Sequence, residues 1–170
     1  MTIFKAKQQH AGQIAALINS AYRGETSRQG WTTEADLLAG RRTDAEEIER
    51  LIAAEGSMLL LCEAKTELVG SVHLQQQAGQ VYLGMLAVSP PLQGKGVGKQ
   101  LLEAAEQAAQ QAWAVNKSVM TVISCRHELI AFYERRGYRR TGISKEFPVN
   151  PALWTPKVAD LCLEILEKVL

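Results

Sequence analysis

The segment that most limits what this chain can fold into runs from residue 81 to residue 112. Its first part, Val81–Val88, is apolar on both faces of an extended chain, which is typical of a central strand covered on both sides. Residues 89–91 (SPP) end this strand, because proline cannot donate a hydrogen bond to a neighbouring strand. A glycine-containing turn at 93–98 then leads into a long helix. The segment therefore predicts a strand, a tight turn and a helix in direct succession.

The helix is amphipathic, and its apolar positions recur at helical spacing. These positions are Val97, Leu101, Ala105, Ala108, Ala109 and Ala112. We expect the polar side chains on the other face to meet solvent, namely Glu103, Glu106, Gln107, Gln110 and Gln111. The start of such a helix binds anions, because its first N–H groups are unpaired and its dipole is positive there. Glycines remove side chains that would keep a phosphate away, although a plain strand-to-helix turn would also use glycine.

Two common phosphate-binding loops do not match this turn. A Walker loop requires Ser or Thr after its Gly-Lys pair, and Gln100 stands at that position. A Rossmann fingerprint requires G-x-G-x-x-G, with an acid at the end of the next strand. Here Gly94, Gly96 and Gly98 are evenly spaced, and the next strand ends at Ser124. Neither of these two nucleotide-binding classes is therefore indicated.

Two motifs together resemble the GNAT superfamily of N-acetyltransferases. That family binds acyl-CoA through Q/R-x-x-G-x-G/A after a strand that ends in a small residue and Val; this chain has QGKGVG at 93–98 after LAV at 86–88. A family helix carries aromatic-Tyr-Glu and is closed by Gly-aromatic, and residues 132–138 (FYERRGY) fit this pattern. The motifs occur in the expected order and separation. The resemblance covers about residues 3–169.

The resemblance implies an α/β (α+β) protein with the GNAT fold, formed by residues 1–170 as one domain. This fold has a mixed, mostly antiparallel central sheet of about seven strands, with helices on both faces. Its fourth and fifth strands, here 81–88 and 118–124, are parallel neighbours that splay apart. Periodicity leaves residues 158–168 open between strand and helix, and the resemblance favours a strand. We expect residues 147–156, which hold three prolines, to be a loop.

Local patterns predict the remaining elements. A capping-box pattern at residues 43–46 (TDAE) opens a helix, and residues 23–43 are expected to be mostly loop, with a short helical turn near 34–39. The other expected elements are a strand at 2–7, a helix at 11–22, a hairpin of strands 58–64 and 68–76, a helix at 128–136 and a strand at 138–146.

By family position, the glycine turn and the splayed strand should bind acetyl-CoA. The resemblance places the pyrophosphate on N–H groups of residues 94–99 and the pantetheine in the gap beside residues 86–88. A buried unpaired N–H or C=O costs about 1–3 kcal/mol, so a splayed strand needs such a partner. The N–H of Val88 would also face the thioester oxygen. The implied cofactor-binding residues are Leu86, Ala87, Val88, Gln93, Gly94, Lys95, Gly96, Val97, Gly98, Lys99, Arg126 and Tyr133.

Tyr133 is the candidate catalytic residue that the resemblance implies. When an amine attacks an acetyl thioester, the leaving thiolate needs a proton. A free Tyr has a pKa of about 10 and a thiol about 8.5, so the transfer from Tyr is uphill by about 2 kcal/mol. The alternative is that Tyr133 belongs only to the core, because it shares an apolar face with Leu129 and Phe132.

The family pattern changes at two positions. Many members carry Asn seven residues before the catalytic Tyr, where this chain has Arg126. Histone-type members carry a Glu as general base five residues before the small residue of the central strand, where this chain has Tyr82. A substrate ammonium with a pKa of about 10.4 must still lose a proton. The base therefore stays open between a water chain, Glu34, Asp36 and His73.

The resemblance places the acceptor site on the helix at 11–22 and the loops at 23–43 and 147–156, and loops on a rigid scaffold usually carry specificity. The candidate substrate-binding residues are Tyr22, Trp31, Glu34 and Trp154. An acid with aromatic residues would suit a cationic amine. The alternative is that the two tryptophans only cover the edge of the core.

Composition narrows the classes of partner. A formal charge of +1 gives no reason to expect nucleic acid or an anionic membrane, and no apolar run reaches the ~20 residues of a membrane-spanning helix. No metal-ligand spacing occurs. The scattered cysteines, Cys62, Cys125 and Cys162, are expected to be reduced core thiols of a cytoplasmic protein.

We therefore expect a cytoplasmic N-acetyltransferase that moves acetyl from acetyl-CoA directly to the primary amine of a small molecule, without a metal. Direct transfer follows from the family and from the lack of a credible nucleophile, since no base is placed to activate Cys125. One alternative is acetylation of a protein or peptide amine. Another is a non-catalytic acyl-CoA-binding or sensing module. A homodimer is compatible with the family.

Overall fold

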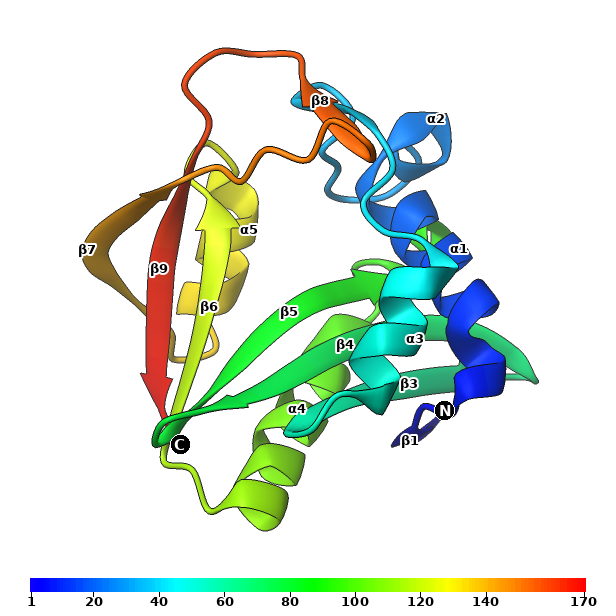
Figure 1. Ribbon diagram of the computed structural model, residues 1–170, viewed down its shortest axis with the longest axis vertical. Coiled ribbons are helices and arrows are strands. Elements are labelled where there is room, and N and C mark those ends of the chain that lie inside the picture. Colours follow the sequence, from blue (N-terminus) through cyan, green and yellow to red (C-terminus); the bar gives the residue numbers. More distant parts are fainter.

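The computed structural model describes residues 1–170 and contains a seven-stranded mixed sheet (Figure 1). All neighbouring strands are antiparallel except β5 and β6. Across the sheet the order is β1 (Thr2–Lys5), β3 (Ser57–Ala64), β4 (Glu67–Gln77), β5 (Gln80–Val88), β6 (Lys117–Ile123), β9 (Cys162–Val169) and β7 (Arg139–Glu146). This confirms the predicted fold class, and the C-terminal segment is a strand.

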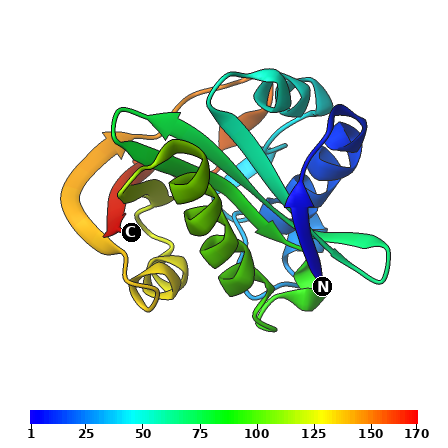
Figure 2. The same ribbon diagram turned by 90° about the horizontal axis from the view of Figure 1, so that it is seen from below.

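Helices cover both faces of this sheet. One face carries α1 (Ala11–Tyr22) and α3 (Ala45–Ala53), and the other carries α4 (Val97–Trp113), which lies across the sheet in Figure 2 beside α5 (His127–Glu134). Short helical turns occupy α2 (Gly24–Ser27), η1 (Gln8–His10) and η2 (Pro90–Leu92). None of the helices combines the length and apolar character that crossing a membrane requires.

The sheet opens between β5 and β6, as predicted. Only two residue pairs join these strands, Val81 with Ser118 and Tyr82 with Val119. On its other edge β5 stays paired to β4, but two residues, Met85 and Leu86, lie opposite the single residue Val72. Met85 has a φ of +49°. A bulge of this kind bends the strand that carries it and increases its twist, which accounts for the separation of β5 from β6 beyond Tyr82.

The hairpin between β3 and β4 turns through two residues. Lys65 and Thr66 both have positive φ, of 50° and 68°, and Ala64 pairs with Glu67. Two residues in the left-handed region match the twist of the flanking strands. The predicted hairpin is therefore present, with a turn one residue shorter than expected.

One polar residue of α4 is buried, which corrects the prediction that it faces solvent. Glu106 is 8% exposed, and its carboxylate accepts a hydrogen bond from the Tyr138 hydroxyl at 3.0 Å and from Lys168 Nζ at 2.6 Å. The Tyr138 hydroxyl also hydrogen-bonds the Ser118 hydroxyl at 2.7 Å. These partners come from distant parts of the chain, so helical spacing alone does not reveal them. Ala112, expected inside, is exposed.

Several local predictions are also corrected. Residues 154–156, expected as loop, form the strand β8 (Trp154–Pro156), which pairs with β2 (Leu38–Gly40) in a small second sheet. The cap of α3 is Asp44 rather than Thr43: the Asp44 carboxylate accepts from the Glu47 N–H at 2.8 Å. Of the three free cysteines, Cys125 is exposed and not part of the core.

Candidate active site

Two cavities meet where β5 and β6 part. The first, which we call the turn cavity, has a volume of about 360 Å³ and borders the glycine turn and α5. The second, the gap cavity, has a volume of about 190 Å³ and lies between β5 and β6. Both cavities share the same small set of lining residues, namely Tyr22, Leu86, Arg126, Leu129 and Tyr133. A ligand in one cavity would therefore touch a ligand in the other at this junction.

The glycine turn presents unpaired N–H groups to the turn cavity. The first bond within α4 runs from the Gln100 N–H to the Gly96 carbonyl at 3.1 Å, so the N–H groups that precede it have no partner within the helix. Gly94 and Gly96 have φ of +77° and +88°, which favours glycine at both positions. At Gly98 an added Cβ would lie 3.5 Å from Phe132, an ordinary contact within the protein. A Cβ added at Gly94 or Gly96 would meet nothing within 4 Å, so the space beside these two residues is open to an anion.

The structure places most of the predicted cofactor-binding residues around the turn cavity. Those that line it are Leu86, Ala87, Val88, Gln93, Gly94, Gly96, Gly98, Lys99, Arg126 and Tyr133. Two predicted residues do not: Lys95 is exposed away from the lining, and the Val97 side chain is buried in the core. The Lys99 ammonium is exposed and 3.8 Å from Glu103, so its charge is partly screened.

Gln93 fixes the mouth of this cavity. Its side-chain NH2 donates to the Val88 carbonyl at 3.1 Å, and its side-chain oxygen accepts from the Thr32 N–H at 3.2 Å. An added Cβ on Gly30 would lie only 2.4 Å from the same oxygen. Gln93 therefore joins the end of β5 to the 30–32 loop, which makes it a positioning residue for the turn.

The free edge of β5 faces the gap. The Ser89 N–H donates to the Val69 carbonyl of β4 at 2.9 Å. Hydrogen-bonding directions alternate along a strand, so the polar groups of Val88 point away from β4. The Leu86 carbonyl follows this direction, because it accepts from the Tyr22 hydroxyl at 3.1 Å. The Val88 N–H therefore has no sheet partner and can donate to a ligand.

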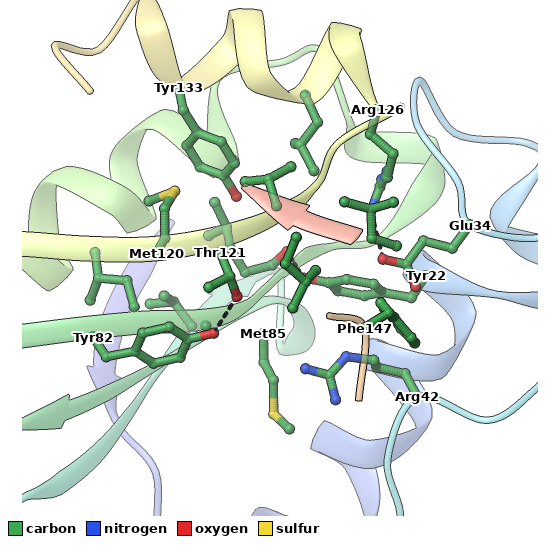
Figure 3. Close-up of a pocket in the computed structure, with 18 of the residues that line it drawn as sticks. Tyr22, Glu34, Arg42, Tyr82, Met85, Met120, Thr121, Arg126, Tyr133 and Phe147 are labelled. Carbon is green, nitrogen blue, oxygen red and sulfur yellow. Dashed lines mark hydrogen bonds and ion pairs between the residues drawn. The ribbon is translucent and has the colours of Figure 1, made fainter. Parts of the chain in front are cut away.

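Tyr133 lies at the junction of the two cavities, on α5 (Figure 3). Tyr133 is 6% exposed, and its ring packs edge-on against those of Phe132 and Tyr138, with centroid distances of 5.2 Å and 5.9 Å. Its hydroxyl makes no hydrogen bond within the protein and points toward the gap cavity. Burial raises the pKa of Tyr133 above its ordinary value, so this side chain stays protonated at neutral pH. It is both a core residue and an available proton donor.

The gap cavity has an unusual charge balance. Its lining includes three arginines, Arg23, Arg42 and Arg126, and one acid, Glu34. Arg23 Nε lies 3.2 Å from one Glu34 oxygen, and Arg126 Nη1 lies 2.9 Å from the other. Both oxygens of this buried carboxylate are therefore already paired with guanidinium groups. The three arginines and one acid leave a formal charge of +2.

The predicted substrate-binding residues divide between the two cavities. Tyr22 lines both, Glu34 and Trp154 line the gap cavity, and Trp31 lines only the turn cavity. Trp31 lies 6.0 Å from the Phe132 ring, and Trp154 lies under the Arg23 guanidinium at 5.2 Å. The roles of these residues stay predictions.

Of the candidate general bases, only Glu34 lines a cavity. His73 is buried, and the loss of solvation together with the nearby Arg42 lowers its pKa to about 4. Asp36 is exposed and lies 2.7 Å from Arg28. At the position of the histone-type Glu, Tyr82 hydrogen-bonds Thr121 across the gap at 2.9 Å. Glu34 and a water chain therefore stay the candidates that this lining allows.

Sequence reasoning missed several lining residues. Arg23, Arg42 and Phe147 lie in segments without periodicity, so no local pattern marks them. The only signal for them is the prediction that the loops at 23–43 and 147–156, which hold these residues, form the acceptor site. No group of three or more His, Cys, Asp or Glu side chains gathers as a metal site would require.

Comparison with known proteins gives a family match for most of the chain. Residues 27–156 match the family model described as an acetyltransferase (GNAT) domain. Comparison with curated protein sequences gives no match.

Three solved structures illustrate the likeness of fold. A ribosomal-protein-alanine N-acetyltransferase from Brucella melitensis superposes with a TM-score of 0.72 at 17% identity, with 100% of each chain covered. An IAA acetyltransferase from Bacillus cereus gives a TM-score of 0.66 at 16% identity, with 99% of each chain covered. A GNAT acetyltransferase from Elizabethkingia anophelis, solved with acetyl-CoA bound, gives 0.61 at 20% identity over 74% of this chain and 82% of that one.

Proposed function

Because the chain belongs to the GNAT family of acetyltransferases, we propose that it transfers the acetyl group of acetyl-CoA directly to the primary amine of a small molecule. The observation that carries this proposal is the meeting of two cavities at the hydroxyl of Tyr133. One cavity has the features that a CoA pyrophosphate requires, and the other is a separate, smaller space. Donor and acceptor can thus be held together.

The residues present fit acetyl-CoA. Unpaired N–H groups at the start of α4 suit its pyrophosphate, because a helix N-terminus attracts anions. The free edge of β5 suits its pantetheine amides, which can take the place of the missing strand. Acetyl-CoA supplies the acetyl thioester, and the Val88 N–H is the group available to stabilise the charge that develops on the thioester oxygen.

In the proposed reaction an N–C bond forms and a C–S bond breaks. The nitrogen of the attacking amine loses one proton to the general base, and the thiolate takes up one proton. Tyr133 is the proposed donor of that proton. Burial raises the pKa of Tyr133, and the same loss of solvation also disfavours the thiolate. The free-energy cost of the proton transfer therefore depends on the difference between the pKa of Tyr133 and that of the thiol. The attacking amine must be neutral. The excess of positive charge in the gap cavity lowers the pKa of an amine bound there and so favours this form.

Two features support direct transfer to a small molecule. Cys125, the nucleophile considered from the sequence, lines neither cavity. The gap cavity, at about 190 Å³, is the smaller of the two, which suits a small acceptor. The similar structures include both a ribosomal-protein-alanine and an IAA acetyltransferase, so a peptide amine is the alternative within the class.

The test measures binding and turnover separately. A thermal shift with acetyl-CoA is compared with one with adenosine 3′,5′-bisphosphate, which lacks the pantetheine arm. At 100 times its Kd, acetyl-CoA should add about 2.7 kcal/mol of stability, and the bisphosphate should add less. CoA release is then followed with small amines and with peptides. An absence of any shift with saturating acetyl-CoA would disprove the enzyme assignment, and release with peptides alone would favour the alternative.

A further inference from the structure

Arg42 is the one arginine of the gap cavity that has no acidic partner. Arg23 and Arg126 both pair with Glu34, whereas no ion pair and no side-chain hydrogen bond involves the Arg42 guanidinium. This group lies over the Tyr22 ring at 5.7 Å, half-buried at the wall of the cavity. A cation held inside a cavity without a partner is available to an anionic ligand.

The backbone that carries Arg42 is held in place. The Asn19 side-chain oxygen of α1 accepts from the N–H of Arg42 at 2.8 Å and from that of Thr43 at 3.1 Å. The Asn19 NH2 donates back to the Thr43 carbonyl at 2.9 Å. Three hydrogen bonds from one side chain therefore anchor this loop to a helix, so the guanidinium starts from a fixed backbone.

Arg42 and Tyr133 approach the cavity from opposite sides. In Figure 3 the Tyr133 hydroxyl enters from α5, and the Arg42 guanidinium enters from the far side, near Tyr22 and Phe147. The lining between these two ends is mostly apolar. An acceptor that places its amine beside Tyr133 would therefore place its other end toward Arg42.

We propose that the acceptor is an amino carboxylate, whose carboxylate binds Arg42 while its amine faces Tyr133. This inference rests on the proposed transfer to an amine. The planar guanidinium can form two parallel hydrogen bonds to a carboxylate. The charge of +2 in the gap cavity opposes a purely cationic amine and is reduced by an acceptor that carries a negative group. Glu34 does not counter this preference, because both of its oxygens are already paired.

The test uses primary amines of graded chain length whose far end is a methyl, hydroxyl, carboxylate or phosphate group. For each, kcat/KM with acetyl-CoA is measured in the wild type, in Arg42→Gln, in Arg42→Lys and in Arg41→Gln. Arg41 is exposed and lines neither cavity, so its variant is the matched control. We expect the carboxylate to exceed the methyl analogue on the order of 10- to 100-fold, which is typical of hydrogen bonds to charged groups. Arg42→Gln should bring that ratio close to one, Arg42→Lys should keep part of it, and Arg41→Gln should leave it unchanged.

A second readout does not depend on turnover. Binding of the same compounds is measured by isothermal titration in the presence of CoA, with the wild type and Arg42→Gln. Tighter binding of carboxylates that is lost in Arg42→Gln supports the inference even if no amine is acetylated, a result that would count against the proposed function alone. Equal turnover and equal binding of methyl and carboxylate analogues would overturn the inference and leave the transferase proposal standing. A preference for the phosphate analogues would overturn the carboxylate assignment.

Discussion

Two neighbouring tyrosines should respond in opposite ways to loss of the hydroxyl. The Tyr133 and Tyr138 rings lie 5.9 Å apart in the same core. The Tyr133 hydroxyl has no hydrogen-bond partner in the protein, whereas the Tyr138 hydroxyl bonds Ser118 and Glu106. If Tyr133 is the general acid, Tyr133→Phe should remove activity without loss of stability. Tyr138→Phe should lower stability without loss of activity.

The structure sets the expected magnitudes. Tyr133→Phe removes no hydrogen bond and keeps the ring contacts, so the free energy of unfolding should change by no more than about 0.5 kcal/mol. Loss of a general acid should lower kcat by about 10²–10⁴-fold, equivalent to about 3–5 kcal/mol in the barrier. Tyr138→Phe leaves Ser118 without its partner and Glu106 with only Lys168, which should cost about 1–3 kcal/mol. At about 2–4 °C per kcal/mol, its Tm should fall by roughly 2–12 °C.

The assay pairs thermal unfolding with CoA release at saturating acetyl-CoA for both variants and the wild type. If acetyl-CoA still raises the Tm of Tyr133→Phe, the acetyl-CoA site of this variant is intact. Because burial raises the pKa of Tyr133, wild-type kcat should also show no alkaline loss from this group up to at least its ordinary pKa of about 10. Unchanged kcat in Tyr133→Phe, with acetyl-CoA still bound, would refute the proton-donor role and leave Tyr133 as a core residue.

Three further outcomes are expected. Gly98→Ala should keep or raise the Tm without ligand, because alanine favours helix over glycine by up to about 1 kcal/mol. The same variant should bind acetyl-CoA at least about tenfold more weakly in titration. Gln93→Ala should remove the bonds to Val88 and Thr32 and raise the KM for acetyl-CoA more than it lowers kcat, as steady-state kinetics would show. The folded pKa of His73, about 4, lies below its unfolded value of about 6.5, so the unfolded state binds the extra proton between these values. Stability should therefore fall on acidification through this window by up to about 3 kcal/mol, and urea unfolding at several pH values should show a smaller fall in His73→Gln.

Local patterns predicted most of the elements because each element carries its own signal. The two-residue turn at Lys65 and Thr66 is bounded by two apolar strands, and the glycine turn follows a strand that prolines end. Glu106 shows the limit of this reasoning. Helical spacing predicts that Glu106 lies on the solvent face of α4, but its partners Tyr138 and Lys168 come from 32 and 62 residues farther along the chain. The spacing of apolar residues predicts the faces of one helix. It does not predict which side chains of other elements pack against those faces.

One of the two cavities of the candidate site can be predicted from the sequence, and the other cannot. The turn cavity follows from motifs, because a glycine turn at a helix start produces open N–H groups wherever it occurs. Apart from Arg126, the charges of the gap cavity are Arg23, Arg42 and Glu34, which lie in the segment 23–43 that the sequence predicts to be mostly loop. This segment has neither a helical or strand periodicity nor a recognisable motif. The contacts depend on how the loop meets α5 and β8, and that is settled by the tertiary structure alone.

Glu34 illustrates why a candidate base cannot be chosen from residue type. Its carboxylate joins Arg23, directly after α1, to Arg126, directly before α5. The first helix packs against β5 and the second follows β6, so this one acid connects the two sides of the splayed sheet. Each of its two oxygens already accepts from a guanidinium group, so neither is free to accept a proton from the acceptor amine. An acid whose two oxygens hold the two walls of the gap together is poorly placed to act as the base for the acceptor. The base is therefore better sought in water that reaches the amine through the gap cavity.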